Sequence, residues 1–334
     1  MGYEVDFLPV ASGGAAICVR WGTPDRYRTL VYDGGTAATG ERLVAHVRRH
    51  YASSHVDYVV SSHPAGDHAS GLAVVLRELE VGELWMHRPW LHATDCHPQQ
   101  AARVLEEEAL KRRIPVHEPF AGARIGPFTV LSPRRDWYTG SLLPAFSRCR
   151  GAVQDRVAPS AAETALRLLS LSGQWIRRLA GRRELPPGHA TIAAESQSSA
   201  VLYGDFDGRG VLLTGCAGVQ ALEAAADCAE LLGIDLQSTL RLLQMPNEGH
   251  SEHVSSRVLD RIVGARQART VRRYTKSAFM SVALGGRASA SRAVAQALIH
   301  RGALGFMTHG MGLHHSHEMP ERGWHRARPV HWRR

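Results

Sequence analysis

The chain has 334 residues, of which 44% are hydrophobic and 21% are charged, which is the composition of a globular protein and not of a disordered one. Its length permits one large domain or two ordinary ones, and its apolar runs are far shorter than the ~20 residues of a membrane-spanning helix. The 40 Lys and Arg residues outnumber the 31 Asp and Glu residues and are nearly all arginine, so an anionic partner such as nucleic acid would not be repelled.

The first residues and the cysteines predict the compartment of the protein. No basic segment followed by an apolar stretch is visible after Met1, so we expect a cytoplasmic protein without membrane association. The five cysteines are odd in number and none is in CxxC spacing. This pattern argues against a disulfide framework and against a zinc ribbon.

The N-terminal part of the chain alternates apolar runs with turn signals. A group of polar residues ends one of these runs, directly before the helical pattern of residues 70–79. The carboxyl end of a buried strand, just before a helix, is where α/β folds place their chemistry. In chain order, the patterns predict three strands, a helix and a fourth strand at residues 4–10, 15–21, 29–35, 39–51 and 56–63.

The remainder of the chain continues the α/β pattern around one segment of different character. Residues 147–190 combine a helical pattern with flanking Arg and Pro, which predicts a helical insertion. Residues 198–215 hold two apolar runs separated by DFDGRG, which is typical of a hairpin. Further strands are predicted at residues 81–87, 114–120, 126–133 and 240–246, and further helices at residues 102–113, 219–233, around 258 and at 291–302.

The loop of residues 61–68 carries the first candidate functional residues, His63, Asp67 and His68. Two histidines and an aspartate on one tight loop can point at a common centre, and both residue types are preferred ligands of zinc or manganese. A capping role at a helix start would explain Asp67 but not the two histidines. The loop therefore predicts a metal site.

This loop resembles the HxHxDH loop of the metallo-β-lactamase fold. Other phrases of the chain are similar to the metallo-β-lactamase-like domain of the DNA-uptake channel protein ComEC and its soluble relatives. Six phrases in the family's order over roughly 250 residues are much harder to obtain by chance than one. They are Gly13-Gly14, Asp33-Gly34-Gly35, SSHPAGDHASGL, Ser199 to Leu202, Leu212 to Cys216, and Met245 to His250.

The resemblance implies a fold and a domain organisation. The fold class is α/β (α+β), an αββα sandwich of two mixed sheets with helices outside and the metals at one edge. Because the resemblance covers nearly the whole chain, we expect a single domain over residues 1–334. Residues 147–190 would be an insertion in it, and residues 305–334 a tail rich in His and Arg.

Several positions depart from the family pattern. Ala65 stands where the family has a second histidine or an aspartate, and alanine ligates nothing. Cys216 replaces a metal-bridging aspartate, and Glu248 stands in the loop that supplies the last ligand. Glu195 is the best match to a further histidine of the wider fold. The metal ligands that the resemblance implies are therefore His63, Asp67, His68, Glu195, Cys216 and Glu248.

Three of these replacements keep atoms that bind metals, so a remodelled site is chemically coherent. It would hold Zn²⁺ or Mn²⁺, as one ion or two. One ion is the more coherent arrangement, because a terminal thiolate at Cys216 does not readily replace a bridging carboxylate. His250 and His253 lie on the same loop as Glu248 and are alternative ligands. If the site is degenerate, it holds no metal.

The activity that the resemblance implies is metal-dependent hydrolysis, and the arginine excess favours a phosphodiesterase or nuclease of ComEC-like type. Asp67 and His68 are the predicted catalytic residues, with Asp67 positioning a water or taking its proton. The alternative is a degenerate protein of the same fold that acts as a binding or regulatory subunit in a competence or phage-defence system. A hydrolase of small thioesters or lactones is a third hypothesis.

Two further expectations concern partners and the tail. Binding of nucleic acid should rest on arginine–phosphate contacts without sequence preference, because the arginines are dispersed and no recognition helix is visible. A protein partner in a defence or competence assembly follows from the alternative function. The histidines from His309 to His331 are interpreted as part of a packed or surface tail and not as a metal site.

Overall fold

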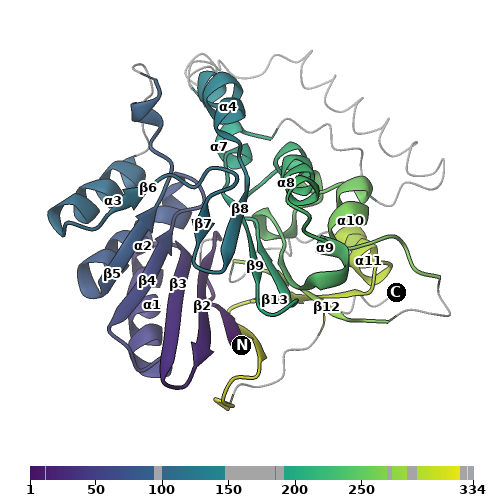
Figure 1. Ribbon diagram of the computed structural model, residues 1–334, viewed down its shortest axis with the longest axis horizontal. Coiled ribbons are helices and arrows are strands. Elements are labelled where there is room, and N and C mark those ends of the chain that lie inside the picture. The colour runs from purple at the N-terminus through teal and green to yellow at the C-terminus, as the bar shows by residue number, and fades with distance from the viewer. Residues whose placement is uncertain are drawn as a thin grey trace, which may run out of the picture.

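Two mixed β-sheets form the centre of the computed structural model, and helices lie on their outer faces (Figure 1). The first sheet has the strand order β14-β1-β2-β3-β4-β5-β6, and the second has the order β13-β12-β11-β10-β9-β8-β7. The structure describes residues 1–11, 13–93, 100–146, 185, 192–268, 273–283, 292–323 and 329.

The first sheet begins as an antiparallel meander and continues as a parallel sheet. β1, β2 and β3 pair antiparallel, β3 to β6 pair parallel, and β14 returns antiparallel to β1. The strands are β1 (Gly2–Phe7), β2 (Ala16–Thr23), β3 (Arg26–Gly34), β4 (His55–Val60), β5 (Glu80–Trp85), β6 (Val116–His117) and β14 (Leu313–His317).

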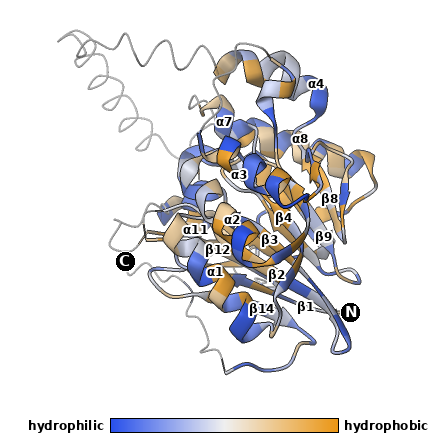
Figure 2. Cartoon of the chain, turned by 90° about the vertical axis from the view of Figure 1, so that its left-hand side faces the viewer, coloured by the Kyte–Doolittle hydropathy of each residue, from blue (hydrophilic) through white to orange (hydrophobic). Residues whose placement is uncertain are grey.

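Three helices cover the outer face of the first sheet: α1 (Ala37–His50), α2 (Gly66–Glu78) and α3 (Gln100–Lys111). Apolar residues at helical spacing, such as Leu43 and Val47 of α1, form one buried cluster with sheet residues such as Val31 and Val59. Charged residues of these helices, such as Arg42, Arg49 and Arg77, are exposed, and Figure 2 shows hydrophilic and hydrophobic residues alternating along each helix. These helices are therefore held by their apolar stripes.

The second sheet combines an antiparallel half, β7 to β10, with a parallel half, β10 to β13. Its outer face packs against α8, α10 and α11 through a cluster that includes Leu222, Leu259 and Leu298. The strands are β7 (Arg124–Ile125), β8 (Phe128–Ser132), β9 (Val201–Asp205), β10 (Gly210–Leu213), β11 (Leu240–Gln244), β12 (Lys276–Met280) and β13 (Ala303–Met307). The helices are α8 (Val219–Leu231), α10 (Ser256–Ile262) and α11 (Arg292–Ile299).

Short helical turns occupy several of the connections between these elements. They are η1 (Pro89–Leu91), α4 (Arg135–Trp137), η2 (Tyr138–Leu142), α7 (Ala194–Gln197), α9 (Leu236–Thr239), η3 (Asn247–Gly249) and η4 (Ser251–His253).

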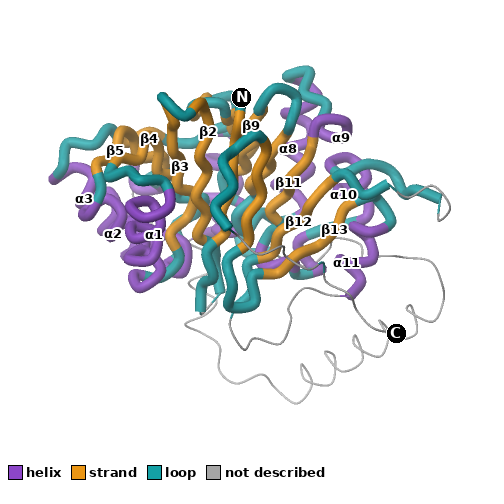
Figure 3. Tube along the Cα trace, turned by 90° about the horizontal axis from the view of Figure 1, so that it is seen from below, coloured by secondary structure: helices purple, strands orange, loops and turns teal. Residues whose placement is uncertain are grey.

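The core between the two sheets is aromatic and aliphatic. Tyr3 of β1 stacks on Phe206, with ring centroids 4.5 Å apart, and Phe7 meets Phe279 of β12 edge-on. Seen from below, the strands lie in the middle, with α1 to α3 on one flank and α8 to α11 on the other (Figure 3). The layer order is helix, sheet, sheet, helix. The expectation of an α/β fold with the αββα sandwich architecture is confirmed.

The predicted tail contributes a strand, β14, and closes the first sheet against β1. The predicted insertion at residues 147–190 lies outside the described residues, apart from Leu185. Within the described part of the chain, no helix is both long enough and apolar enough to cross a membrane.

Candidate metal centre

Three loops that follow strands meet at one edge of the sandwich. His63 lies between β4 and α2, and His68 lies in the first turn of α2. Cys216 follows β10, and Asn247 follows β11. The turn before Cys216 is held by β11, because Gln244 accepts hydrogen bonds from the backbone N–H groups of Thr214 and Gly215. Strand ends of both sheets therefore position this site.

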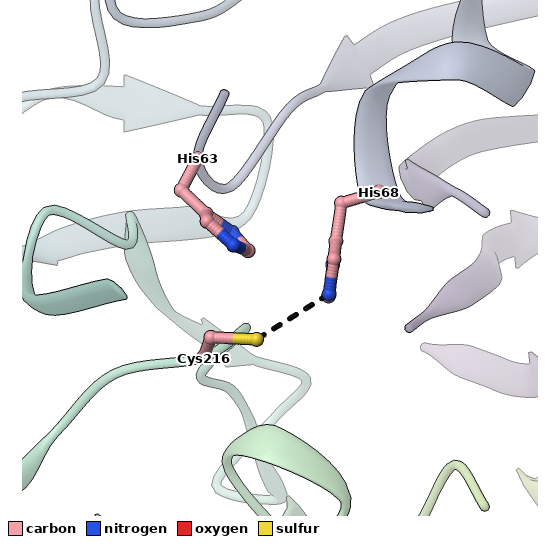
Figure 4. Close-up of side chains that lie close together, drawn as sticks. All are labelled: His63, His68 and Cys216. Atoms are coloured by element: carbon pink, nitrogen blue, oxygen red, sulfur yellow. Dashed lines mark hydrogen bonds between the residues drawn. The ribbon is translucent and has the colours of Figure 1, made fainter. Parts of the chain in front are cut away.

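The side chains of His63, His68 and Cys216 converge at this edge of the sandwich (Figure 4). One ligand atom of each lies within 4.8 Å of the other two, and the Sγ atom of Cys216 is 3.3 Å from Nε2 of His68. All three side chains are buried. The close approach is possible because Gly215 has a φ of +55° and no side chain to collide with Ser62.

A second layer of residues fixes both imidazole rings. Asp33, at the end of β3, accepts a hydrogen bond from Nδ1 of His68 at 2.8 Å and one from the Ser62 hydroxyl at 2.7 Å. Since the Ser62 proton goes to Asp33, the Ser62 oxygen accepts from Nδ1 of His63, 2.9 Å away. Both histidines therefore present Nε2 as the atom for a metal, which is how second-layer carboxylates orient zinc ligands.

The electrostatics of the two histidines differ. Burial, and then the nearby His68, lower the pKa of His63 to about 3, so this ring is neutral at physiological pH. Burial alone would also lower the pKa of His68, but Cys216 and Asp33 raise it well above its usual value. Nε2 of His68 and Sγ of Cys216 are hydrogen-bonded to each other at 3.3 Å. Metal binding would displace the proton of this hydrogen bond.

These residues fit a divalent metal by their chemistry. Two imidazole nitrogens and one thiolate sulfur are zinc ligands, and three protein ligands plus one open position is the arrangement of catalytic zinc sites. A thiolate favours zinc over manganese, which prefers oxygen ligands. The donor set of this pocket therefore suits one zinc ion.

The three carboxylates of the predicted set lie outside this close cluster. Asp67 is exposed in the first turn of α2, and Glu195 is half-buried in α7. Both are near enough to raise the pKa of His63 electrostatically, although burial dominates that pKa. Glu248 turns toward the loop between β1 and β2, where its Oε1 accepts the N–H of Gly14 at 3.2 Å. Metal ligation by these carboxylates stays a prediction.

The alternative histidine ligands are placed differently again. His250 is exposed. His253 is buried, and its Nδ1 faces the carbonyl oxygens of Cys216 and Ala217 at 3.0 and 3.2 Å, while its Nε2 meets the side-chain amide of Asn247 at 2.9 Å. Both nitrogens of His253 are therefore already engaged within the protein.

The sequence analysis did not single out Asp33, Ser62 or Asn247 as residues of the site. Asp33 had a signal, because it begins the Asp-Gly-Gly phrase of the resemblance. Ser62 and Asn247 also lie in phrases of the resemblance, but their importance depends on hydrogen bonds to His63 and to His253 that only the folded chain creates.

Comparison with known proteins identifies a family for this fold. The family model described as the metallo-beta-lactamase superfamily matches residues 25–259. No curated protein matches the chain.

Two solved structures are similar to parts of it. A metallo-beta-lactamase from Hirschia baltica is 15% identical, covers 39% of this chain and 60% of its own, and has a TM-score of 0.22. This chain thus spans less than two thirds of that protein. MEM-A1, a subclass B3 metallo-beta-lactamase from a soil metagenome library, is 12% identical and covers 78% of this chain and 83% of its own, with a TM-score of 0.31.

Proposed function

This chain belongs to the metallo-beta-lactamase superfamily, and from that premise we propose that it is a zinc-dependent phosphodiesterase that acts on nucleic acid. Superfamily membership indicates a metal-dependent hydrolase. The finer assignment, a ComEC-like nuclease of the cytoplasm, rests on the phrases that the sequence shares with that group and on the arginine excess.

One observation carries the proposal: the buried cluster of His63, His68 and Cys216 with Asp33 behind it. Burying two imidazoles beside a thiol is costly unless they are hydrogen-bonded or bind a metal. A fold that needed only an apolar core would place aliphatic side chains here. The cluster therefore supports a metal-binding role for this edge of the sandwich.

The chemistry divides between the metal and the chain. A zinc ion held by His63, His68 and Cys216 would supply Lewis acidity and bring the pKa of a water near 7. Asp67 is an exposed carboxylate next to these ligands, so it can take a proton from the attacking water. Asp33 keeps the His68 ring oriented throughout, and Glu195 adds negative charge at the pocket.

Substrate binding would rest on arginine. The formal charge of +9 attracts a polyanion, and guanidinium groups bind phosphate in a bidentate manner. With dispersed arginines, affinity should be independent of base sequence, and the logarithm of the affinity should fall linearly with the logarithm of the salt concentration, with a slope of about 0.7–0.9 per contacted phosphate.

A second candidate is a binding or regulatory subunit without turnover, which would have a protein partner in a competence or phage-defence assembly. The observations that favour it are the missing ligand at Ala65 and the engagement of Glu248 by Gly14. A site with fewer ligands than its relatives could have lost its metal while the fold persisted.

Metal content and hydrolysis decide between the two candidates. The chain is purified without a histidine tag, its zinc and manganese are measured, and cleavage of bis(p-nitrophenyl) phosphate and of single- and double-stranded DNA is followed with and without a chelator. We expect about one zinc per chain, as three protein ligands imply. We also expect activity that the chelator abolishes.

The variant Asp67→Asn should retain the metal and lose about 10²–10⁴-fold in kcat, as the loss of a general base does. A chain without metal and without cleavage would favour the binding subunit. Cleavage of thioesters or lactones alone would favour the small-molecule hydrolase.

A further inference from the structure

The loop after β11, where Glu248 was the expected ligand, brings the side-chain amide oxygen of Asn247 to the metal cluster. Oδ1 of Asn247 lies 3.6 Å from Sγ of Cys216. We propose that Asn247 is the fourth protein donor of a single-ion site and that His253 is the residue that orients it. This inference rests on the proposed function, since it requires that the cluster binds a metal.

The orientation of the Asn247 amide follows from a chain of hydrogen bonds. Nδ1 of His253 faces two carbonyl oxygens, which only accept, so this nitrogen carries the proton of the neutral ring. Nε2 of His253 is then an acceptor, and the Asn247 amide must turn its NH₂ group toward it. The Asn247 oxygen is consequently directed at Cys216.

The backbone holds Asn247 in the same position. Its N–H donates to the carbonyl of Gly215 at 3.0 Å, which ties the loop to the turn that carries Cys216. Asn247 has a φ of +42° and Glu248 a φ of +58°. Asparagine tolerates this left-handed region, but glutamate is strained in it, and such strain collects at functional sites. The strained conformation sends the Glu248 side chain to Gly14 and the Asn247 side chain to Cys216.

The spacing of the donor atoms fits a tetrahedral ion. With zinc bonds of ~2.3 Å to sulfur and ~2.1 Å to nitrogen or oxygen, neighbouring ligand atoms of a tetrahedron are about 3.5–3.6 Å apart. The observed separations from Sγ of Cys216 are 3.3 Å to His68 and 3.6 Å to Asn247. The two distances from Cys216 thus match tetrahedral spacing, and the ligand atoms of His63, His68 and Cys216 lie within 4.8 Å of one another.

A neutral fourth donor also has a consequence for the substrate class. Two neutral imidazoles, one thiolate and one amide leave a divalent ion with a net charge of about +1, whereas a carboxylate in place of the amide would leave it neutral. An amide oxygen is also a weaker ligand of zinc than a carboxylate or a thiolate. Asn247 would therefore be the donor that a water or an anionic substrate such as a phosphodiester displaces, which gives the ion the open position of a catalytic site.

The test uses cobalt(II) as a spectroscopic substitute for zinc in the full-length, metal-free chain. Wild-type protein is titrated while the thiolate-to-cobalt charge-transfer band and the d–d bands of four-coordinate cobalt are recorded, and zinc affinity is measured by competition. Asn247→Leu should weaken both affinities by about 10–100-fold and reduce the d–d intensity, while Asn247→Asp should preserve or raise them. His253→Gln should weaken binding, and the matched change His250→Gln on the same loop should not.

The outcomes separate this inference from the proposed function. Wild-type protein that takes up no cobalt overturns the metal proposal and this inference with it. If wild type binds cobalt and Asn247→Leu binds it with the same affinity and spectrum, Asn247 is not a donor, and the metal proposal stands. Circular dichroism identifies a variant that fails to fold, and in that case Asn247→Asp decides, since weaker binding by this variant contradicts an oxygen donor.

Discussion

At the scale of single residues, Cys216 gives the site its character. It replaces the bridging aspartate of the resemblance, and its sulfur lies 3.3 Å from the imidazole that Asp33 orients. A terminal thiolate serves one ion, whereas a carboxylate can span two. The position of this one side chain therefore favours a mononuclear site over the two-metal sites to which a bridging aspartate belongs.

Substitutions of Cys216 should show whether metal binding requires a thiolate at this position or only a side chain that can bind a metal. Cys216→Ser removes a strong zinc ligand, so we expect zinc affinity to fall by at least about 100-fold and the stabilisation of the fold by zinc to vanish. Cys216→Asp restores a carboxylate and should keep zinc affinity within about tenfold of wild type. Competition with a zinc chelator and melting temperatures with and without zinc provide the measurements. Unchanged metal content in both variants would identify Cys216 as a buried apolar residue only.

At the scale of elements, the glycine pair between β1 and β2 determines how closely the loops of the site approach one another. Gly14 has a φ of +93°, and a Cβ on it would meet the backbone oxygen of Asp67 at under 3.0 Å. A Cβ on Gly13 would likewise collide with the carboxylate of Glu248. The two glycines let the first loop press against the start of α2, which carries His68, and against the loop after β11.

Gly14→Ala should therefore displace the first turn of α2, which carries His68. Gly122 is the matched control, because it has the same φ of +93° with nothing within 4 Å of its Cβ position. Gly122→Ala should cost about 1–2 kcal/mol of unfolding free energy from backbone strain alone. Gly14→Ala should cost about 2 kcal/mol more and should also weaken zinc binding. Urea titrations and zinc competition on both variants test this, and equal effects of the two changes would contradict it.

The same loops show how far the sequence predicts the site. Strands, helices and the loop with His63 and His68 were predictable because their signals are local, in apolar periodicity and turn residues. The role of Asn247 was not predictable, because it depends on a hydrogen bond to His253 and on the left-handed backbone conformation of Glu248. Nothing in the local sequence predicts that a glutamate adopts this conformation. The sequence analysis assigned Glu248 to the metal. Both Glu248 and the neighbouring Asn247 have a side-chain oxygen that can bind a metal, so residue type alone does not show which of them faces the site.

At the scale of the whole molecule, the C-terminal part of the chain packs against the N-terminal strand. β14 pairs with β1, and beyond it Arg322 reaches Glu4 and Asp6 on the outer face of β1, where both carboxylates are fully buried. Burial would raise the pKa of Asp6, but hydrogen bonds from His314 and His46 and the charge of Arg322 lower it far below its usual value. The tail is thus held by an ionic network, which the interpretation as a packed tail did not specify.

Removing Arg322 should test that network. Arg322→Met leaves two buried carboxylates with less positive charge, and we expect a loss of about 3–5 kcal/mol in unfolding free energy. The control Arg48→Met breaks the half-exposed pair with Glu78 and should cost about 1 kcal/mol or less. Chemical denaturation at neutral pH compares the two. A cost for Arg322→Met as small as that of the control would mean that the tail contributes little to the fold.

The pH dependence of stability depends on histidines that are buried without charge. His87 is 3% exposed and stacks on Tyr138. Among the residues that the structure describes, neither ring nitrogen has a hydrogen bond of ordinary geometry, although the backbone of Ser198 acts to raise the pKa of the ring. Burial, and then the nearby His92, lower its pKa to about 3, while burial and then His314 lower the pKa of His315 to about 4. Unfolded histidine titrates near ~6.5, so the unfolded chain binds more protons than the folded chain between these values.

Unfolding free energy should consequently fall as the pH drops below about 6.5, by on the order of 2 kcal/mol per buried histidine at pH 5, and the loss from His87 should level off below its folded pKa of about 3. His87→Phe keeps the ring between Tyr138 and Phe120 but removes the titrating group, so its stability should decline less steeply between pH 7 and pH 5. Urea unfolding with a chelator present, at both pH values, measures the difference. The exposed His55→Gln serves as control, and a slope for His87→Phe equal to those of wild type and this control would show that His87 is not buried as a neutral ring.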